Sequence, residues 1–233
     1  MPSEASTSVT AVPTAPLADA CVRLGLPIRL APVTLVPVRR GMLIAGPAVP
    51  VTHAGSVDVL LEAIDDASPG DVLVVDNGGR HDEACVGDLI ALEAQNADLA
   101  GIVIWGRHRD TAQIVDMGMP LWSLGAMPPG PRRVPPAGAS MRTAWLDGVE
   151  VHTDDVIAAD DDGVLLIAAA EWPRVLDAAQ QIQQTELVQA ERMRAGESLR
   201  AQLDFAGYRA RQRSEPELSL RRYLAERGGA IEV

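Results

Sequence analysis

The sequence predicts an α/β fold built on a largely parallel sheet, followed by a helical C-terminal tail. Short apolar runs that suit buried strands alternate with helical patterns between residues 56 and 125, and this alternation favours parallel pairing with crossover helices. From Glu171 onward the pattern is helical. The length of 233 residues, 47% hydrophobic and 22% charged, suits one large domain with such a tail and argues against general disorder.

The elements before the alternating region are a flexible lead, a helix and two strands. Residues 1–16 form the lead, which lacks the basic start and apolar core of a secretory signal. Residues 17–24 predict a short helix that Gly25 ends. The runs at 33–38 and 42–51 look like strands, and their prolines favour a sheet edge or a bend.

The alternating region opens with a helix at residues 56–67. Ser56 is its expected N-cap, and Pro69-Gly70 stop it. Residues 71–76 then predict a buried strand that runs into an Asn-Gly-Gly turn.

A second helix and a second buried strand follow, at residues 84–98 and 100–106. Leu89 and Leu92, with Ala97 as a further candidate, are expected on the apolar face of this helix. A crossover of this kind returns the chain to the same edge of the sheet.

The third step of the alternation covers residues 110–118 and 120–125. The first range predicts a short helix with Asp110 at or near its N-cap and Gly118 at its end, and the second predicts a strand. The proline- and glycine-rich residues 126–140 are expected to be irregular.

The remaining predicted strands flank an acidic run at residues 154–162. Residues 148–153 and 163–169 look like strands, and the acidic residues between them are interpreted as turn residues rather than a calcium loop, because their spacing fits no known loop. Helical residues 171–233 extend the α/β domain at 17–170. This extension carries ten acidic and ten basic residues, a pattern that suits packing on the domain or a neighbouring subunit and also suits solvent exposure.

The composition excludes several classes of enzyme. All twenty basic residues are arginines, and the sequence contains no lysine. Schiff-base aldolases and pyridoxal-phosphate enzymes need a lysine amine, and a Walker-type nucleotide site needs the lysine of its GK[ST] motif. These three classes are therefore excluded.

Charge and cysteine content restrict the partners and the compartment. The net charge of −12 disfavours nucleic acid, and the arginine pairs at 39–40 and 132–133 are interpreted as solvated loop charge. No apolar run is long enough to span a membrane. Cys21 and Cys85 are too few for a disulfide framework, which favours a cytoplasmic location.

Charged residues mark the carboxyl ends of two predicted neighbouring strands. Asp88 follows one strand and its turn, and Arg109-Asp110 follow the next strand after twenty intervening residues. Ligands of open α/β sheets bind at this edge, where the first N–H groups of a helix can hold an anion. Arg109 suits a carboxylate or enolate oxygen, and Asp110 suits Mg²⁺ or Mn²⁺. These residue types predict a metal-assisted site for a 2-oxo acid. The alternative is that Asp110 only caps a helix and that the neighbouring arginine has no role in binding.

The stretch "PGDVLVVDNGGR…CVGDLIALEAQNADLAGIVIWGRHRD…MPLWSLG" resembles the RraA-like family, over about residues 20–168. This family includes metal-dependent 4-hydroxy-4-methyl-2-oxoglutarate / 4-carboxy-4-hydroxy-2-oxoadipate aldolases. Those aldolases have an Asp, twenty residues and then Arg-Asp, which Asp88, Arg109 and Asp110 match. The resemblance implies a layered, swivelling β/β/α-type domain, assembled as homotrimers or homohexamers with the active site between subunits.

The resemblance also implies a role for each site residue. Asp110 would ligate the metal directly, Arg109 would bind the substrate and stabilise the enolate, and Asp88 would act through a metal-bound water. The backbone groups that would receive the pyruvyl carboxylate are those of Gly87, Leu89 and Ile90.

Other side chains near the motif have open roles. The aldolases use a glutamate from a neighbouring subunit, for which Glu186 and Glu191 are the candidates. Arg107 and His108 are interpreted either as surface or packing residues or as contacts to the leaving half of the substrate. Cys85 is expected to be a packed thiol rather than a nucleophile, since no partner histidine is identifiable.

The leading functional hypothesis is a metal-dependent lyase. It would cleave a 4-hydroxy-2-oxo dicarboxylic or tricarboxylic acid to pyruvate and a second carbonyl compound, and would decarboxylate oxaloacetate through the same pyruvate enolate. The alternative is a non-catalytic regulator, since RraA itself is known as an inhibitor of the RNA-processing endonuclease RNase E. A menaquinone methyltransferase, the label of some similar sequences, is disfavoured because a glycine-rich nucleotide turn is missing.

Overall fold

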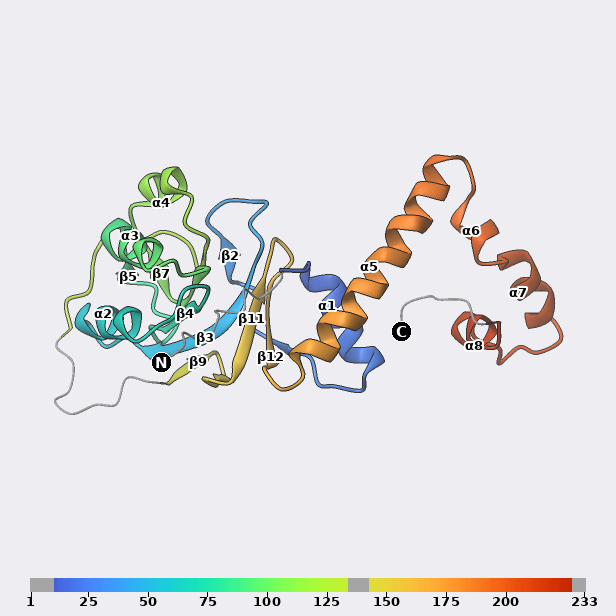
Figure 1. Cartoon of the computed structure of the whole chain (residues 1–233), viewed down its shortest axis with the longest axis horizontal. Coiled ribbons are helices and arrows are strands. Elements are labelled where there is room, and N and C mark those ends of the chain that lie inside the picture. Colours follow the sequence, from blue (N-terminus) through green and yellow to red (C-terminus); the bar gives the residue numbers. More distant parts are fainter. Residues whose placement is uncertain (1–10, 134–142, 228–233) are drawn as a thin grey trace, which may run out of the picture. The chain divides into compact units, whose positions relative to one another are not determined.

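A computed structural model describes residues 11–133 and 143–227, which fall into two compact units. Of the described residues, the first unit takes in 11–15 and 28–173, and the second combines 16–27 with 174–227. The first is an α/β domain and the second is helical (Figure 1). The predicted fold class, including the helical C-terminal region, is therefore confirmed.

One eight-stranded sheet organises the α/β unit, with the strand order β1-β12-β11-β3-β4-β6-β8-β2. Its parallel strands are β3 (Ile44–Thr52), β4 (Val72–Asp76), β6 (Gly101–Trp105) and β8 (Leu121–Ser123). Its antiparallel strands are β1 (Arg29–Leu30), β2 (Val36–Pro37), β11 (Asp155–Ala159) and β12 (Val164–Ala168). The parallel pairing that the alternating pattern predicts is confirmed.

Side chains of the parallel strands alternate between two hydrophobic cores. Val72 and Val74 lie in one core with residues of the antiparallel strands, whereas Leu73 and Val75 lie in the other, with residues of the helices. All four are fully buried, and burial of each such side chain stabilises the fold by about 1.5–3 kcal/mol. Burial on both faces explains why these strands are continuous apolar runs in the sequence.

Strand β3 contains two prolines although it lies inside the sheet. Its first half, through Pro47, pairs with β11, and its second half, which contains Pro50, pairs with β4. Each half thus has one hydrogen-bonded neighbour, so that a proline nitrogen can face the unpaired side. The prolines do not mark an edge here, and the strand is strongly curved (Figure 1).

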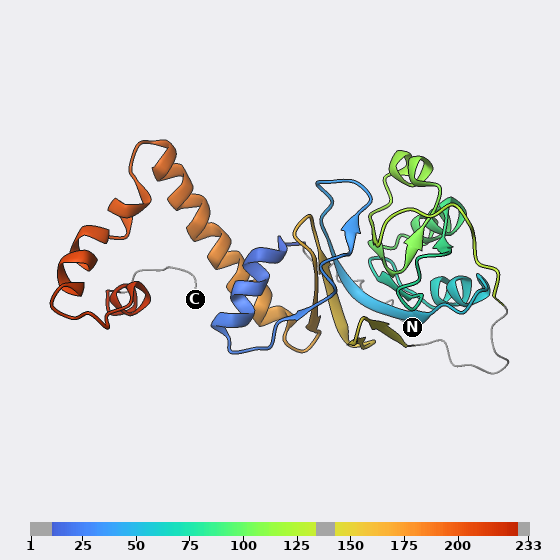
Figure 2. The same ribbon diagram turned by 180° about the vertical axis from the view of Figure 1, so that it is seen from behind.

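Three helices cover the second core: α2 (Asp58–Asp65), α3 (Asp88–Asn96) and α4 (Thr111–Met117). Figures 1 and 2 show them gathered beside the parallel strands. The N-cap of α2 is Val57 and not the predicted Ser56, and it makes no side-chain cap hydrogen bond. Gly118 ends α4 with a φ of 78°, as predicted.

The prediction for the helix at residues 84–98 is wrong in its start and in its buried face. Residues 84–86 form strand β5 (Ala84–Val86), which pairs in parallel with β7 (Arg107–His108). The buried residues of α3 are Ala91 and Ala94, whereas Leu89 is 75% exposed and Leu92 is 42% exposed. Small side chains face the core here, and the larger Leu89 remains available at the surface.

The last strands of the α/β unit include two that the sequence interpretation missed. These are β9 (Ala144–Leu146), which pairs with β10 (Val149–Val151), and β11, which lies within the acidic run. The run is a turn at Asp160–Asp162, as predicted, but the apolar residues before it form a fully buried strand. The irregular connection is described as far as Arg133, and the rest of it lies outside the described residues.

The second unit contains helices throughout. Its elements are α1 (Thr14–Arg23) and α5 (Trp172–Arg194), each without its first two residues, and α6 (Leu199–Gln202), α7 (Phe205–Gln212) and α8 (Leu220–Ala225). Helix α1 begins three residues before the predicted range, and Gly25, with a φ of 69°, follows its last turn. Tyr208, Leu218, Tyr223 and Leu224 form a small buried cluster under α7 and α8. Across the described residues, no helix is long and apolar enough to cross a membrane.

Candidate active site

The two charged positions predicted from the sequence lie side by side at the start of α3. The pairing of β5 with β7 brings them together, and beyond it the Arg109 amide donates a 2.9 Å hydrogen bond to the Val86 carbonyl. The residues that follow each strand, Asp88 on one and Asp110 on the other, are thereby in contact. The expected convergence is present, but it is formed at the separate two-stranded sheet of β5 and β7 and not by neighbouring strands of the eight-stranded sheet.

Asp110 turns its carboxylate toward α3. Its backbone is left-handed, with a φ of 60°, and although Asp110 is the N-cap residue of α4, its side chain caps no amide of that helix. Instead, its Oδ2 accepts a 3.4 Å hydrogen bond from the Asp88 amide and lies 3.3 Å from Nε of Arg109. The predicted N-cap position is thus confirmed, while the carboxylate serves the site rather than its own helix.

Gly87 allows this close approach. A Cβ atom at this position would lie 2.6 Å from Oδ2 of Asp110 and 3.0 Å from Nε of Arg109. Its φ of −125° is open to any residue, so lack of space, and not backbone conformation, requires a glycine here. The positive end of the α3 dipole faces the same spot and favours negative charge.

The first amides of α3 form a partly open anion site. The Leu89 amide donates a 2.8 Å hydrogen bond to Oδ1 of Asp88, and the first helical bond runs from Ala91 to Gly87. For the Ile90 amide, the described part of the chain provides no acceptor. A ligand carboxylate can therefore bind the Ile90 amide directly and take the place of Asp88 on the Leu89 amide.

These groups border a cavity of about 350 Å³. The lining residues are Val57, Leu61, Ala84, Cys85, Gly87, Asp88, Leu89, Ile90, Glu93, Arg109 and Pro131. The Arg109 side chain is 47% exposed and lines the cavity, so a small molecule there can reach it. The Asp110 side chain is 34% exposed and lies beside Arg109, outside the lining.

The described part of the proline-rich connection, residues 126–133, forms a wall of this cavity. The Ala84 amide donates a 2.8 Å hydrogen bond to the Pro129 carbonyl, and Pro131 lines the cavity. Gly130 lies so close to Arg109 that a Cβ there would be 2.7 Å from a guanidinium nitrogen. The segment therefore holds the Arg109 side chain in place from one side.

A buried polar network holds the end of this wall. Arg133 donates to Oε1 of Glu83 at 2.6 Å and to Oδ1 of Asn77 at 3.0 Å, and His53 Nδ1 lies 2.9 Å from the same Asn77 oxygen. Burial acts to raise the pKa of Glu83, but its hydrogen bonds and the charges of Arg133 and Arg80 outweigh burial and lower it. Glu83 therefore stays ionised and keeps Arg133 paired.

Comparison with known proteins decides the family. Residues 14–166 match the family described as RraA-like, Aldolase/RraA. This chain belongs to the RraA-like family. The match covers well over half of the sequence and includes all three charged residues of the site.

Similar proteins extend this assignment. A protein of Halalkalibacterium halodurans is 28% identical over 151 residues, which is 64% of this chain and 71% of that protein. That protein carries the provisional name 4-hydroxy-4-methyl-2-oxoglutarate aldolase. An uncharacterised protein from Pseudomonas syringae has a solved structure with a TM-score of 0.70 at 25% identity, covering 81% of this chain and 90% of that one. The structure of RraAS2 from Streptomyces coelicolor, titled an unusual member of the RNase ES inhibitor RraA protein family, has a TM-score of 0.64 at 25% identity, covering 76% and 90%.

The contacts of His108, which directly precedes the Arg-Asp pair, indicate its role. His108 is 3% exposed, with Nδ1 2.7 Å from Oγ of Ser123 and Nε2 2.9 Å from Oγ1 of Thr111. Burial, with the nearby charge of Arg107, lowers the pKa of His108. His108 is thus a packing residue between β8 and α4, and both of its ring nitrogens are engaged.

Arg107 and Cys85 also have contacts that indicate a packing role rather than a role in binding. The Arg107 guanidinium lies 2.7 Å from Nδ1 of His81 and is not among the residues that line the cavity. Cys85 borders the cavity but is buried, and burial raises the pKa of its thiol to about 12. The expectation of a packed thiol is therefore confirmed.

The structure adds cavity residues that the sequence did not reveal. Glu93 and Leu61 lie on the facing surfaces of two helices, and Gly130 and Pro131 belong to a connection expected only to be irregular. A solvated helical glutamate has no distinguishing signal in sequence. The proline-rich composition hides which of its residues pack against the site.

The carboxylates of this RraA-like site suit a divalent metal ion. Asp110 and Asp88 offer hard oxygen atoms, of which Oδ2 of Asp110 accepts from the Asp88 amide and Oδ1 of Asp88 accepts from the Leu89 amide. Within the described ranges, no group of three His, Cys, Asp or Glu side chains is close enough to hold a metal ion. Mg²⁺ is usually held by one or two carboxylates plus water and substrate oxygens, and the partly exposed Asp110 is the side chain here that could serve as such a ligand.

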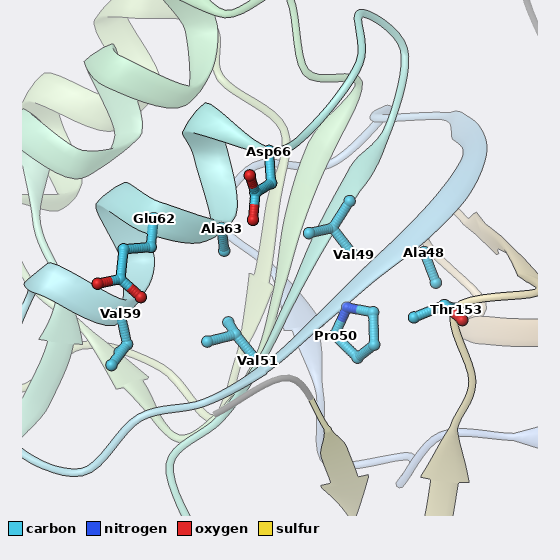
Figure 3. A pocket seen from close by; sticks show the side chains of 9 residues that line it. All are labelled: Ala48, Val49, Pro50, Val51, Val59, Glu62, Ala63, Asp66 and Thr153. Atoms are coloured by element: carbon cyan, nitrogen blue, oxygen red, sulfur yellow. The ribbon is translucent and has the colours of Figure 1, made fainter. Parts of the chain in front are cut away.

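A second cavity, of about 210 Å³, lies between α2 and β3 (Figure 3). Val49, Pro50 and Val51 form its floor, and the carboxylates of Glu62 and Asp66 project from α2 at its rim. No basic side chain is among its lining residues. It therefore lacks the group that a carboxylic acid ligand requires, and the cavity beside Arg109 remains the candidate site.

Proposed function

We propose that this RraA-like chain is a metal-dependent lyase that cleaves a 4-hydroxy-2-oxo acid to pyruvate and a second carbonyl compound, with oxaloacetate decarboxylation as an accompanying activity. The observation that carries this proposal is that the Asp110 carboxylate contacts both the Asp88 amide and Arg109, beside a cavity lined by Asp88, Arg109 and the first turn of α3. The name of the relative from H. halodurans agrees with it.

The substrate head group is bound by Arg109 and the α3 amides in this proposal. The pyruvyl carboxylate accepts from the Leu89 and Ile90 amides, where the helix dipole adds to the attraction. The Arg109 guanidinium contacts the 2-oxo oxygen and stabilises the negative charge that develops there. Because Gly130 packs against Arg109, the guanidinium needs little rearrangement during the reaction.

Cleavage breaks the bond between C3 and C4, and its electron pair passes into the enolate of pyruvate. The 4-hydroxyl loses its proton as its carbon becomes a carbonyl, and Asp88, acting through a water molecule, is the proposed acceptor of that proton. Return of this proton to C3 then converts the enolate to pyruvate. A Mg²⁺ or Mn²⁺ ion on Asp110 would polarise the 2-oxo group and share the enolate charge.

Pyruvate release from oxaloacetate and 4-hydroxy-2-oxo acids tests this function. We expect release that requires Mg²⁺ or Mn²⁺ and stops with a chelator. Arg109→Ala should lower kcat by about 10²–10³-fold, the usual effect of removing one group that stabilises an oxyanion. Arg107→Ala is the matched control, since Arg107 lies two residues away and does not line the cavity. Equal turnover by Arg109→Ala and the wild type would show that the site is wrong.

We further propose a homotrimer or homohexamer in which a neighbouring subunit supplies Glu186 or Glu191 to the cavity. Both residues lie on α5. The test mixes an inactive Arg109→Ala chain with a Glu186→Gln or Glu191→Gln chain and measures pyruvate. A subunit-shared site would regain activity on mixing, because some sites then receive both intact residues. No recovery from either glutamate variant would contradict the proposal.

A second candidate function is non-catalytic binding to an RNA-processing endonuclease. The similarity to RraAS2, whose title places it in a family of RNase ES inhibitors, favours it. The net charge of −12 suits a basic surface on such a partner. A stable complex in pull-down with an RNase E-type enzyme, together with no metal-dependent turnover of any 2-oxo acid, would establish this function over the lyase.

A further inference from the structure

The walls of the cavity beside Arg109 differ in chemistry from one side to the other. Asp88, Arg109 and the first amides of α3 make one side polar. The wall supplied by the segment around α2 is apolar and consists of Val57 and Leu61. A ligand held by its carboxylate at Arg109 would place the remainder of the molecule against this second wall.

Leu61 and Glu93 lie together on the side away from Arg109. Both residues line the cavity and also line a neighbouring groove between α2 and α3, which Arg109 does not border. Glu93 is exposed, and Leu61 is 44% exposed. The part of a substrate that extends from the 2-oxo head group therefore meets an aliphatic side chain and a carboxylate.

The charges of the lining residues do not suit a second acidic group. Arg109 is the one basic residue among them, whereas Asp88 and Glu93 are both acidic. The first carboxylate of the ligand already uses Arg109 and the α3 amides. Among the described lining residues of this chain a second carboxylate would find no further cation, and the glutamate proposed from a neighbouring subunit would add negative charge. Repulsion between two like charges at 4 Å costs about 1 kcal/mol even in water, and more when partly buried.

We propose that the ligand of this cavity is a 2-oxo acid with an uncharged, apolar tail, and that Leu61 and Glu93 set this specificity. Leu61 and Val57 pack against the tail, and Glu93 discriminates against acidic tails. This inference rests on the proposed function, which places the 2-oxo head group at Arg109. The corresponding lyase substrate is a 4-hydroxy-2-oxo acid with an alkyl or aryl group on C4, in place of the dicarboxylic or tricarboxylic acids that the family resemblance implies.

Binding of two uncleavable acids tests the proposal independently of catalysis. The acids 2-oxohexanoate and 2-oxoadipate have the same chain length and differ in a terminal methyl or carboxylate, and neither has a 4-hydroxyl group. Calorimetry with the full chain and Mg²⁺ should show 2-oxohexanoate binding at least about tenfold more tightly. Arg109→Ala should weaken both acids, because both use the same head-group site.

Variants of the two specificity residues carry the test further. Glu93→Gln should reduce the preference for 2-oxohexanoate several-fold, and Leu61→Arg should favour 2-oxoadipate. Asp116→Asn is the matched control for charge, because Asp116 is exposed on α4 and lines neither the cavity nor the neighbouring groove. Leu92→Arg is the control for a new arginine, since Leu92 is comparably exposed on α3 and also lies outside the lining.

The outcomes separate this inference from the proposed function. Equal or tighter binding of 2-oxoadipate to the wild type, absence of binding by either acid, undiminished binding to Arg109→Ala, or equal effects of Glu93→Gln and Asp116→Asn would each overturn the specificity proposal. Selective binding of 2-oxohexanoate without pyruvate release from any 4-hydroxy-2-oxo acid would support it and reject the lyase. Preferred cleavage of dicarboxylic substrates would support the lyase and reject the specificity proposal.

Discussion

At the scale of single residues, the arrangement depends on how closely Asp110 and Arg109 approach the start of α3. Gly87 leaves the space for them, since a Cβ atom there would lie 2.6 Å from the Asp110 carboxylate. The left-handed backbone of Asp110, with a φ of 60°, sends the carboxylate toward α3 instead of capping α4. Aspartate is among the residues that tolerate this conformation.

Gly87→Ala is expected to impair the site with little loss of fold stability. The added methyl group must displace the carboxylate of Asp110 or the side chain of Arg109, both of which are partly exposed and can move outward. We expect kcat/KM for pyruvate release to fall by about 10²-fold, as for small misplacements of catalytic groups. Thermal unfolding should be nearly unchanged. Wild-type activity in this variant would show that the close approach is not needed.

At the scale of elements, residues 126–133 connect the site to the buried network around Glu83. Arg133 closes this connection through its bonds to Glu83 and Asn77. The neighbouring Arg132 is exposed. One arginine of this pair therefore holds the cavity wall, although both look alike in sequence.

Arg133→Ala should loosen the wall and destabilise the α/β unit. It leaves Glu83, which is 4% exposed, without its closest cation, and unpaired buried groups typically cost about 1–3 kcal/mol. We expect KM for the 2-oxo acid to rise, and hydrogen exchange at the Ala84 amide to accelerate because its bond to Pro129 weakens. Arg132→Ala is the control. Similar changes in both variants would refute the specific role of Arg133.

The helical unit has its own local anchor at the start of α7. The Asp204 side chain accepts from the Gly207 amide as an N-cap, and its second oxygen accepts a 2.6 Å hydrogen bond from the Tyr223 hydroxyl of α8. One carboxylate thus starts one helix and holds another.

Asp204→Ala should destabilise α7 and α8 by about 1 kcal/mol, the usual effect of losing an N-cap. Tyr223→Phe removes only the bond to α8 and should cost less. Hydrogen exchange of the α7 amides in the full chain measures both effects. Unchanged exchange in Asp204→Ala would contradict the role of the cap.

At the scale of the whole molecule, two buried histidines link stability to pH. Burial lowers the pKa of His53 and of His108 below the ordinary value of 6.5. Asn77, Glu83, Arg133 and Asp58 also act on His53, and of these Arg133 adds to the lowering. The unfolded chain therefore binds protons more readily than the folded chain as pH falls through about 6.5.

The free energy of unfolding should consequently be highest above pH 6.5 and should fall as pH decreases toward the lowered pKa values of the two histidines. Chemical denaturation at pH 7.5 and 5.5 measures this difference. His108→Gln removes one of the two titrating groups and should reduce it. A free energy of unfolding that rises on acidification across this window would contradict the assignment.

The order of buried strands and crossover helices could be predicted from the sequence, because two-sided burial leaves continuous apolar runs and helical phasing between them. The meeting of Asp88 with Arg109 and Asp110 was expected because a crossover returns the chain to one sheet edge, whereas the pairing of β5 with β7 that forms it was not predicted. The buried face of α3 could not be predicted, because its alanines are buried while its leucines are exposed.

Sequence by itself determined the α/β class, the absence of lysine chemistry and the three charged residues of the site, since these depend on residue type and local spacing. Only the tertiary structure decided the rest. It showed β5 in place of the first turn of the predicted helix, His108 between two hydroxyl groups and Glu93 beside Leu61. Such features depend on contacts between segments distant in sequence, and no local pattern records which of many polar or aliphatic side chains will meet.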